Sequence, residues 1–259
     1  MKKLIGLLLA LLFFTSYVMA DDIRFVQVTD LKYSKSDENN VLPKIINDIN
    51  KLKNIDFVVF TGDNIQKPNE KDLKAFIKET KKLKKEFHIA IGEKDVNKHK
   101  DLSKKQYAKI ARRNISIAKD GNINYIFTKK GVVFIIADGA KDVIPSANGY
   151  FKNDTVDWIN TNLDSHLNQN VIIIQHFPLI PPENNETYVT LKPEKYMEVL
   201  NSHKNVKAII SGHFGVNKEE IKDGISHITT APAPYYRIID ILDCTSSNPT
   251  IWAEVRKAE

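Results

Sequence analysis

Five segments of the sequence end in a side chain that can bind a metal ion. Each side chain follows a short, apolar, β-branched run that is typical of a buried strand. The carboxyl ends of the strands in an open α/β sheet form the crevice where ligands bind, so we expect these side chains to converge. Carboxylates and imidazoles together suit zinc, manganese or iron. The five candidate metal ligands are Asp30, Asp63, Glu93, His176 and His213.

Glycine directly precedes three of the candidates, in the pairs Gly62-Asp63, Gly92-Glu93 and Gly212-His213. A glycine lets the chain turn sharply at the end of a strand and present the next side chain to the crevice. Each candidate alone has an ordinary alternative, since a strand-end Asp often caps a helix or turn and a lone His often lies in a core. The combination of five favours a shared site.

The elements that must position these residues alternate along the chain. Alternating strands and helices indicate parallel crossovers with helices on both faces of a sheet. After Ser211 the pattern changes to short extended segments with a turn signal at Asp223-Gly224, which predicts a β-rich C-terminal sheet packed on the first. The predicted strands are 23–28, 57–60, 89–91, 132–137, 171–174 and 208–210, and the predicted helices are 43–53, 71–85, 104–113, 155–167 and 193–202.

The order of these motifs resembles that of the calcineurin-like metallophosphoesterases, also called the purple acid phosphatase-like superfamily. That family carries Asp-x-His, Gly-Asp-x-x-Asp/Asn, Gly-Asn-His-Asp/Glu, a lone His and Gly-His-x-His in this order. The resemblance covers the whole chain after residue 20. It implies a four-layer α/β/β/α sandwich of two mixed sheets flanked by helices. It also implies two metal ions that share the Gly-Asp carboxylate and act on a phosphate ester.

The resemblance also shows where this chain departs from the family. The first metal would need histidines at positions 32 and 215, where this chain has Lys32 and Gly215. The second metal would use Asp63, His176 and His213, and Glu93 replaces the family's asparagine as a competent ligand. The sequence therefore predicts at most one well-formed divalent site, for zinc, manganese or iron, and a second ion that lacks two ligands.

Three further residues are predicted to act at the reaction centre. Lys94 replaces the histidine that the family uses near the phosphate, and Asp95 is kept from the same motif. Lys32 is expected to place its ammonium group where the first metal would lie and to neutralise Asp30 and Asp63. Two lysines against three carboxylates leave a negative site, so phosphate binding should depend on the remaining ion.

Three functional interpretations follow from these departures. The first is a one-metal phosphoesterase that acts on a small phosphate ester or a phosphoprotein. The second is an inactive pseudo-phosphoesterase that binds a ligand or a protein partner. The third is a metal-free salt-bridge network among the charged residues with a structural role only.

Composition and net charge restrict the class of protein. The 259 residues are 42% hydrophobic and 27% charged, as in soluble globular domains. The formal net charge is +6, but the lysines are scattered rather than interleaved with aromatics, so we expect no nucleic-acid partner.

The first twenty residues match an export signal. Lys2 and Lys3 precede an apolar run over 4–14, and Val18-Met19-Ala20 fits a cleavage site. The run is too short to span a bilayer, so we expect no transmembrane segment in the mature chain. The predicted organisation is a signal peptide over 1–20 and one phosphoesterase domain over 21–259, periplasmic or secreted. The single cysteine, Cys244, excludes an intramolecular disulfide.

Overall fold

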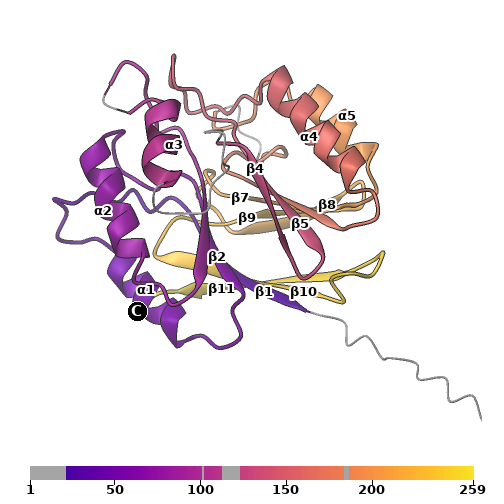
Figure 1. Cartoon of the computed structure of the whole chain (residues 1–259), viewed down its shortest axis with the longest axis horizontal. Helices are drawn as coiled ribbons and strands as arrows, with labels where there is room; N and C mark the ends of the chain where they lie inside the picture. The colour runs from indigo at the N-terminus through magenta and orange to yellow at the C-terminus, as the bar shows by residue number, and fades with distance from the viewer. Residues whose placement is uncertain (1–21, 101, 113–122, 184–186) are drawn as a thin grey trace, which may run out of the picture.

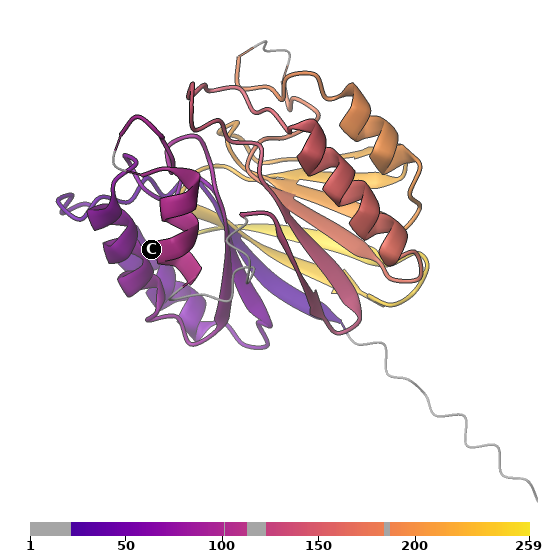
Figure 2. The same cartoon turned by 45° about the horizontal axis from the view of Figure 1, so that its top comes forward.

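Two β-sheets pack face to face in the computed structural model of the chain (Figure 1). The structure describes residues 22–100, 102–112, 123–183 and 187–259. Helices lie outside both sheets, with α1, α2 and α3 gathered on one side and α4 and α5 on the other (Figure 2). The four-layer α/β/β/α arrangement expected from the resemblance is therefore confirmed.

The first sheet has a parallel centre and an antiparallel edge. Strand β1 pairs in parallel with β2, and β2 with β3, whereas β10 runs antiparallel to both β1 and β11. The parallel part places the ends of β1, β2 and β3 along one edge. In spatial order the strands are β11 (Thr250–Lys257), β10 (Tyr235–Leu242), β1 (Ile23–Val28), β2 (Phe57–Thr61) and β3 (Glu86–Ala90).

The second sheet has the same general plan. Strands β5, β6, β7 and β9 are parallel, and β4 and β8 close the two edges as antiparallel partners. The parallel part therefore also directs several strand ends to one edge. In spatial order the strands are β4 (Tyr125–Lys129), β5 (Val132–Ala137), β6 (Val171–Gln175), β7 (Val206–Ser211), β9 (Ile225–Thr229) and β8 (Lys218–Lys222).

The helices connect successive strands and bury one apolar face each. In α1 the buried residues Leu42, Ile45, Ile46 and Ile49 follow helical spacing. Helix α2 begins after Asn69, whose side chain accepts a hydrogen bond from the Asp72 backbone N–H at 2.8 Å. None of the helices within the described ranges has the length and apolar character needed to cross a membrane. The helices are α1 (Leu42–Lys51), α2 (Glu70–Thr80), α3 (Lys104–Arg112), α4 (Asn153–Ser165) and α5 (Glu194–Asn201).

The sequence predictions differ from the structure in one main respect. The segments after Ser211 do not form a separate C-terminal sheet: β8 and β9 extend the second sheet, whereas β10 and β11 extend the first. The turn predicted at Asp223-Gly224 does join β8 to β9. Strand β4 was not among the predicted strands. The predicted signal peptide over 1–20 lies outside the described residues.

Aromatic side chains and one buried amide join the two sheets. Phe25 of β1 stacks on Phe57 of β2 at 4.7 Å between ring centroids, and both meet Phe134 of β5 edge-on. Gln27 is fully buried, and its amide donates hydrogen bonds to the Ser211 carbonyl at 2.8 Å and to Thr61 Oγ1 at 3.0 Å. This amide fixes the end of β1 against the end of β7.

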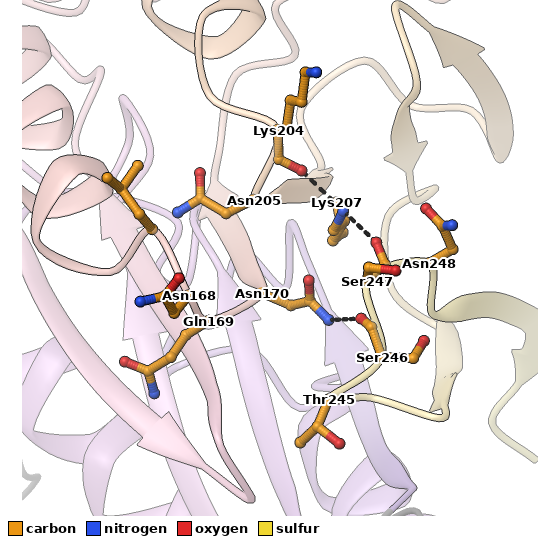
Figure 3. Close-up of a pocket in the computed structure, with 11 residues that line it drawn as sticks. Asn168, Gln169, Asn170, Lys204, Asn205, Lys207, Thr245, Ser246, Ser247 and Asn248 are labelled. Carbon is orange, nitrogen blue, oxygen red and sulfur yellow. Dashed lines mark hydrogen bonds between the residues drawn. The ribbon is translucent and has the colours of Figure 1, made fainter.

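A polar cavity of about 420 Å³ lies at the end of the second sheet where β6 and β7 begin (Figure 3). Asn170 and Asn205 line it, and these residues directly precede β6 and β7. The Asn170 side chain donates to the Ser246 carbonyl at 2.6 Å, so the cavity wall includes the β10–β11 connection. This cavity is therefore separate from the carboxyl ends of the strands.

We predict that Gln27→Leu lowers the free energy of unfolding by about 3 kcal/mol, because it leaves the buried Ser211 carbonyl and the Thr61 and Thr230 hydroxyls without that partner. Urea denaturation measures this change. Gln66→Leu, at an exposed position where the backbone N–H donates to the Tyr33 carbonyl, is the control and should change stability by less than about 0.5 kcal/mol. Equal stability of the two variants would contradict the role given to Gln27.

Candidate metal centre

The two sheets bring the five candidate ligands to one buried location between their edges. Asp30, Asp63 and Glu93 follow strands of the first sheet, whereas His176 and His213 follow strands of the second. Their donor atoms form two groups, one of Glu93, His176 and His213 and one of Asp30, Asp63 and His176. Within each group all donor atoms lie within 4.8 Å of one another, so the predicted convergence occurs.

The backbone turns sharply at these positions. Asp30, Asp63 and His213 have φ angles of 52°, 51° and 68°, in the left-handed region that non-glycine residues rarely adopt. Each such residue costs roughly 1–2 kcal/mol. Backbone hydrogen bonds hold these turns, including Asp30 N–H to the Gly62 carbonyl at 3.0 Å. The strained turns direct the side chains into the space between the sheets.

Two glycines of the site, Gly62 and Gly92, lie so close to neighbouring side chains that no larger residue fits. Gly62 has φ +96°, and a β-carbon on it would lie 2.5 Å from His176 Nδ1. A β-carbon on Gly92 would collide with the Asp63 carboxylate, although the φ of Gly92 is not in the left-handed region. The sequence predicted that these glycines allow a sharp turn, and this holds for Gly62. At Gly92 glycine is needed because a side chain there would occupy the space of the Asp63 carboxylate.

Backbone carbonyls fix the orientation of both histidine rings. The Nδ1–H of His176 donates to the Thr61 carbonyl and the Nε2–H of His213 to the Ala147 carbonyl, each at 2.7 Å. The other ring nitrogens, His176 Nε2 and His213 Nδ1, face each other at 3.1 Å. Glu93 Oε2 lies 3.1 Å from the first and 3.3 Å from the second. Three acceptor atoms thus meet at one point, which a shared proton or a cation must stabilise.

Asp63 provides a fourth acceptor. Its Oδ1 accepts a hydrogen bond from the Lys94 backbone N–H at 2.9 Å and lies 3.6 Å from His176 Nε2. Its Oδ2 is buried and has no hydrogen-bond partner among the described residues, with Lys94 Nζ at 3.8 Å. A buried carboxylate oxygen without a hydrogen bond is destabilising unless a cation compensates it. The residues present therefore fit a divalent ion.

Asp30 and Lys32 are arranged differently from the sequence expectation. Asp30 Oδ2 accepts hydrogen bonds from the Thr29 hydroxyl and the His213 backbone N–H, both at 2.9 Å. Lys32 Nζ lies 3.7 Å from Asp30 Oδ1, as expected, but the lysine that pairs with Asp63 is Lys94. Each carboxylate thus has its own lysine, rather than one lysine serving both.

Asp95 is fully buried beneath the turn that carries Glu93. Its Oδ2 accepts hydrogen bonds from the Gly92 backbone N–H at 2.9 Å and from the Asn64 side chain at 3.0 Å, and its Oδ1 accepts one from Ile65 N–H at 3.0 Å. Burial raises the pKa of Asp95 to about 6, although these hydrogen bonds oppose the shift. Its observed contacts hold the loops after β2 and β3 together.

The metal-free cluster retains a proton. Burial opposes protonation of His176, but the Asp63 carboxylate and the hydrogen bond with Glu93 raise its pKa to about 10. Burial favours the neutral form of Glu93, yet its close contacts with His176 and His213 hold its pKa well below the ordinary value. Burial raises the pKa of Asp63, against the attraction of His176. The folded cluster therefore binds a proton more tightly than the unfolded chain does.

Several supporting groups were not predicted from the sequence. The Thr61 and Ala147 groups that orient the histidines are backbone carbonyls, which have no sequence signature. Thr29 and Asn64 directly neighbour Asp30 and Asp63, so their position beside the predicted ligands was the available signal.

We predict that the free energy of unfolding of the chelator-treated protein falls between about pH 6.5 and 10. The stabilisation from protonated His176 is complete below the unfolded pKa near 6.5 and is lost as the pH rises through the folded pKa of about 10. One proton gives a slope of at most about 1.4 kcal/mol per pH unit. His176→Gln should remove this slope and the control His166→Gln, at the end of α4, should keep it, as measured by urea denaturation at each pH. A wild-type slope in His176→Gln would contradict the assignment.

Comparisons with known proteins agree with this fold. A family model described as calcineurin-like phosphoesterase matches residues 23–217, which is more than half of the chain. No curated protein matches the chain.

Solved structures show the same architecture at low identity. A dimetal phosphatase from Danio rerio has a TM-score of 0.66 and 14% identity, over 92% of this chain and 99% of that one. GAP50, described as the anchor in the inner membrane complex of Plasmodium, has a TM-score of 0.59 and 14% identity, over 92% and 89%. Purple acid phosphatase PPD1 from yellow lupin has a TM-score of 0.60 and 15% identity, over 92% of this chain and 52% of that one. At these identities the likeness shows a shared fold.

The family match spans the strands that carry all five converging side chains, and the two-sheet architecture is that of the matched structures. The chain belongs to the calcineurin-like phosphoesterase family.

Proposed function

We propose that the protein is a phosphoester hydrolase that depends on one divalent metal ion. The observation that carries the proposal is the meeting of Glu93 Oε2, His176 Nε2 and His213 Nδ1 within 3.1 to 3.3 Å. Beside them lies Asp63 Oδ2, which has no hydrogen-bond partner in the part of the chain that the structure describes. These four residues would hold the ion. Their mixture of two imidazoles and two carboxylates suits zinc, manganese or iron. When bound, such an ion acts as a Lewis acid on a phosphoryl oxygen and lowers the pKa of water.

Lys32 and Lys94 are proposed to bind the phosphate group. Both side chains are partly exposed, and each ammonium lies within 4 Å of a buried carboxylate, so each can turn toward a ligand in the crevice. Ammonium groups stabilise the charge on phosphoryl oxygens and can supply the proton that the departing oxygen needs. The two lysines do not outweigh the carboxylates of Asp30, Asp63 and Glu93, so phosphate binding requires the divalent ion.

The remaining residues position this constellation. Asp30 holds the backbone of His213 through its bond to the His213 N–H. Asp95 fixes the turn that carries Glu93 and Lys94 through its bond to Gly92 N–H. We therefore assign both residues positioning roles, rather than the catalytic role predicted for Asp95 from the sequence.

A second candidate function is ligand or protein binding without catalysis. It is favoured by Lys32 and Gly215, which stand where the family resemblance predicts two histidine ligands. Among similar folds, GAP50 is described as an anchor, which supports a binding role for this architecture. The two candidates differ in one measurable property, the turnover of a phosphate ester.

The proposed substrate is a small phosphate ester or a phosphoprotein, and the proposed location is the periplasm or the exterior of the cell. The location is supported by the basic residues Lys2 and Lys3, the apolar run over 4–14 and the small residues before Asp21.

We predict that the zinc- or manganese-loaded protein hydrolyses p-nitrophenyl phosphate and that Asp63→Asn lowers kcat/KM by at least about 100-fold, because it removes a carboxylate from the ion. The release of p-nitrophenol measures the rate. Asp138→Asn is the matched control, since Asp138 also follows a strand but pairs with Lys104 outside the cluster. It should retain the wild-type rate within about threefold.

Wild-type protein that binds the ion but hydrolyses no faster than Asp63→Asn would contradict the hydrolase and leave the binding function.

A further inference from the structure

We propose that Tyr188 forms a subsite for a planar aromatic leaving group beside the metal centre. The proposal deepens the proposed function and rests on it. The substrate class is an aryl phosphate or another phosphomonoester whose leaving group has a flat ring.

Tyr188 is placed directly against a candidate metal ligand. Its ring centroid lies 5.5 Å from that of His213, with the two planes at 64°. His213 in turn presents Nδ1 to Glu93 and His176 at the centre of the cluster. The tyrosine is 44% exposed, so a large part of its ring remains open to a ligand. A group attached to a phosphate at the metal centre can therefore reach the Tyr188 ring.

The backbone at Tyr188 is strained and held in place. Its φ is 69°, which a bulky residue adopts only when its surroundings impose it. Asn148 Oδ1 accepts a hydrogen bond from the Tyr188 N–H at 2.7 Å. The Gly149 N–H donates to the Val189 carbonyl at 3.0 Å, and the Leu191 N–H donates to the Gly149 carbonyl at 2.8 Å. Three hydrogen bonds thus hold the backbone of 188–191 against residues 148 and 149, so the position of the partly exposed aromatic residue is fixed in advance, which lowers the cost of ordering it on binding.

The loop paired with Tyr188 also touches His213. The Ala147 carbonyl of this loop accepts the hydrogen bond from His213 Nε2. The border of the site next to His213 therefore has an aromatic ring, whereas its centre has lysines and carboxylates.

This division of chemistry matches a substrate with a charged phosphate and an apolar, planar leaving group. Aromatic rings pack on a tyrosine in offset or edge-to-face arrangements that a short alkyl group cannot form. Sugar or glycerol phosphates lack such a ring and would gain nothing from Tyr188. The subsite thus predicts a preference for aromatic over small aliphatic phosphate esters.

The test compares two non-hydrolysable ligands, phenylphosphonate and methylphosphonate, bound to the zinc-loaded protein and measured by isothermal titration calorimetry. We expect phenylphosphonate to bind about tenfold more tightly to the wild type. Tyr188→Ala should reduce the ratio of the phenylphosphonate affinity to the methylphosphonate affinity to about one. Tyr188→Phe should keep the wild-type ratio, because the ring is kept. Damage to the metal centre weakens both ligands alike, so the ratio isolates the subsite.

Trp252→Ala is the matched control, because Trp252 is an exposed aromatic on edge strand β11 and is paired with Asp240, away from the cluster. It should keep the wild-type ratio. If Tyr188→Ala does not fold, Tyr188→Leu replaces it, because leucine also removes the aromatic ring and should reduce the ratio of the two affinities to about one.

Three results would overturn the subsite. An unchanged ratio in Tyr188→Ala or Tyr188→Leu, or equal binding of both phosphonates by the wild type, would reject the subsite and leave the hydrolase intact. If zinc-loaded wild type bound neither phosphonate, both the subsite and the proposed function would be rejected.

Discussion

The buried meeting of acceptor atoms is the constraint on which the rest of the site depends. Two imidazole nitrogens and a carboxylate oxygen lie within 3.1 to 3.3 Å of one another, and the outer nitrogens of both rings already donate to carbonyls. Such an arrangement is unstable without a positive charge at its centre. A proton on His176 can supply that charge in the metal-free protein, and a divalent ion can replace it. Protons and metal ions therefore compete for the same position, and the ion should bind more tightly as the pH rises.

The fold makes this arrangement possible because each sheet contributes one kind of ligand. The first sheet supplies the carboxylates and the second supplies the imidazoles, so the cluster forms only when the sheets pack together. Gln27 joins the sheets close to the strand ends, and the Asp30 carboxylate joins them again through the His213 backbone. The left-handed turns at Asp30 and His213 are tolerated because the bond between them holds both, and the Asp63 carbonyl accepts a hydrogen bond from the Lys32 N–H. Stability of the sandwich and geometry of the site are thus linked through the same residues.

Much of this structure follows from local sequence patterns, and the rest depends on long-range pairing. Apolar runs before Asp30, Asp63 and His176 predict strands whose ends carry polar groups, and the structure has these strands. The placement of β10 and β11 in the first sheet, with β8 and β9 in the second, depends on which distant strands pair, and short extended segments carry no such information. The partner of Asp63 also depends on side-chain direction: Lys94 takes this place, although Lys32 was the sequence prediction. The Ala147 carbonyl that orients His213 could not be predicted from the sequence, since any residue at that position presents the same backbone group.

The most direct test of the account is the metal content of purified protein after reconstitution with zinc, manganese or iron. We predict about one ion per chain for the wild type and none for the double variant His176→Ala/His213→Ala. Lys32→His/Gly215→His should bind about two ions, because it supplies the two missing histidines; the space beside Gly215 is open, although its φ of +84° adds strain. Wild-type protein without an ion under all three conditions, or equal ion content in the wild type and in His176→Ala/His213→Ala, would contradict the central claim that these acceptor atoms form a metal site.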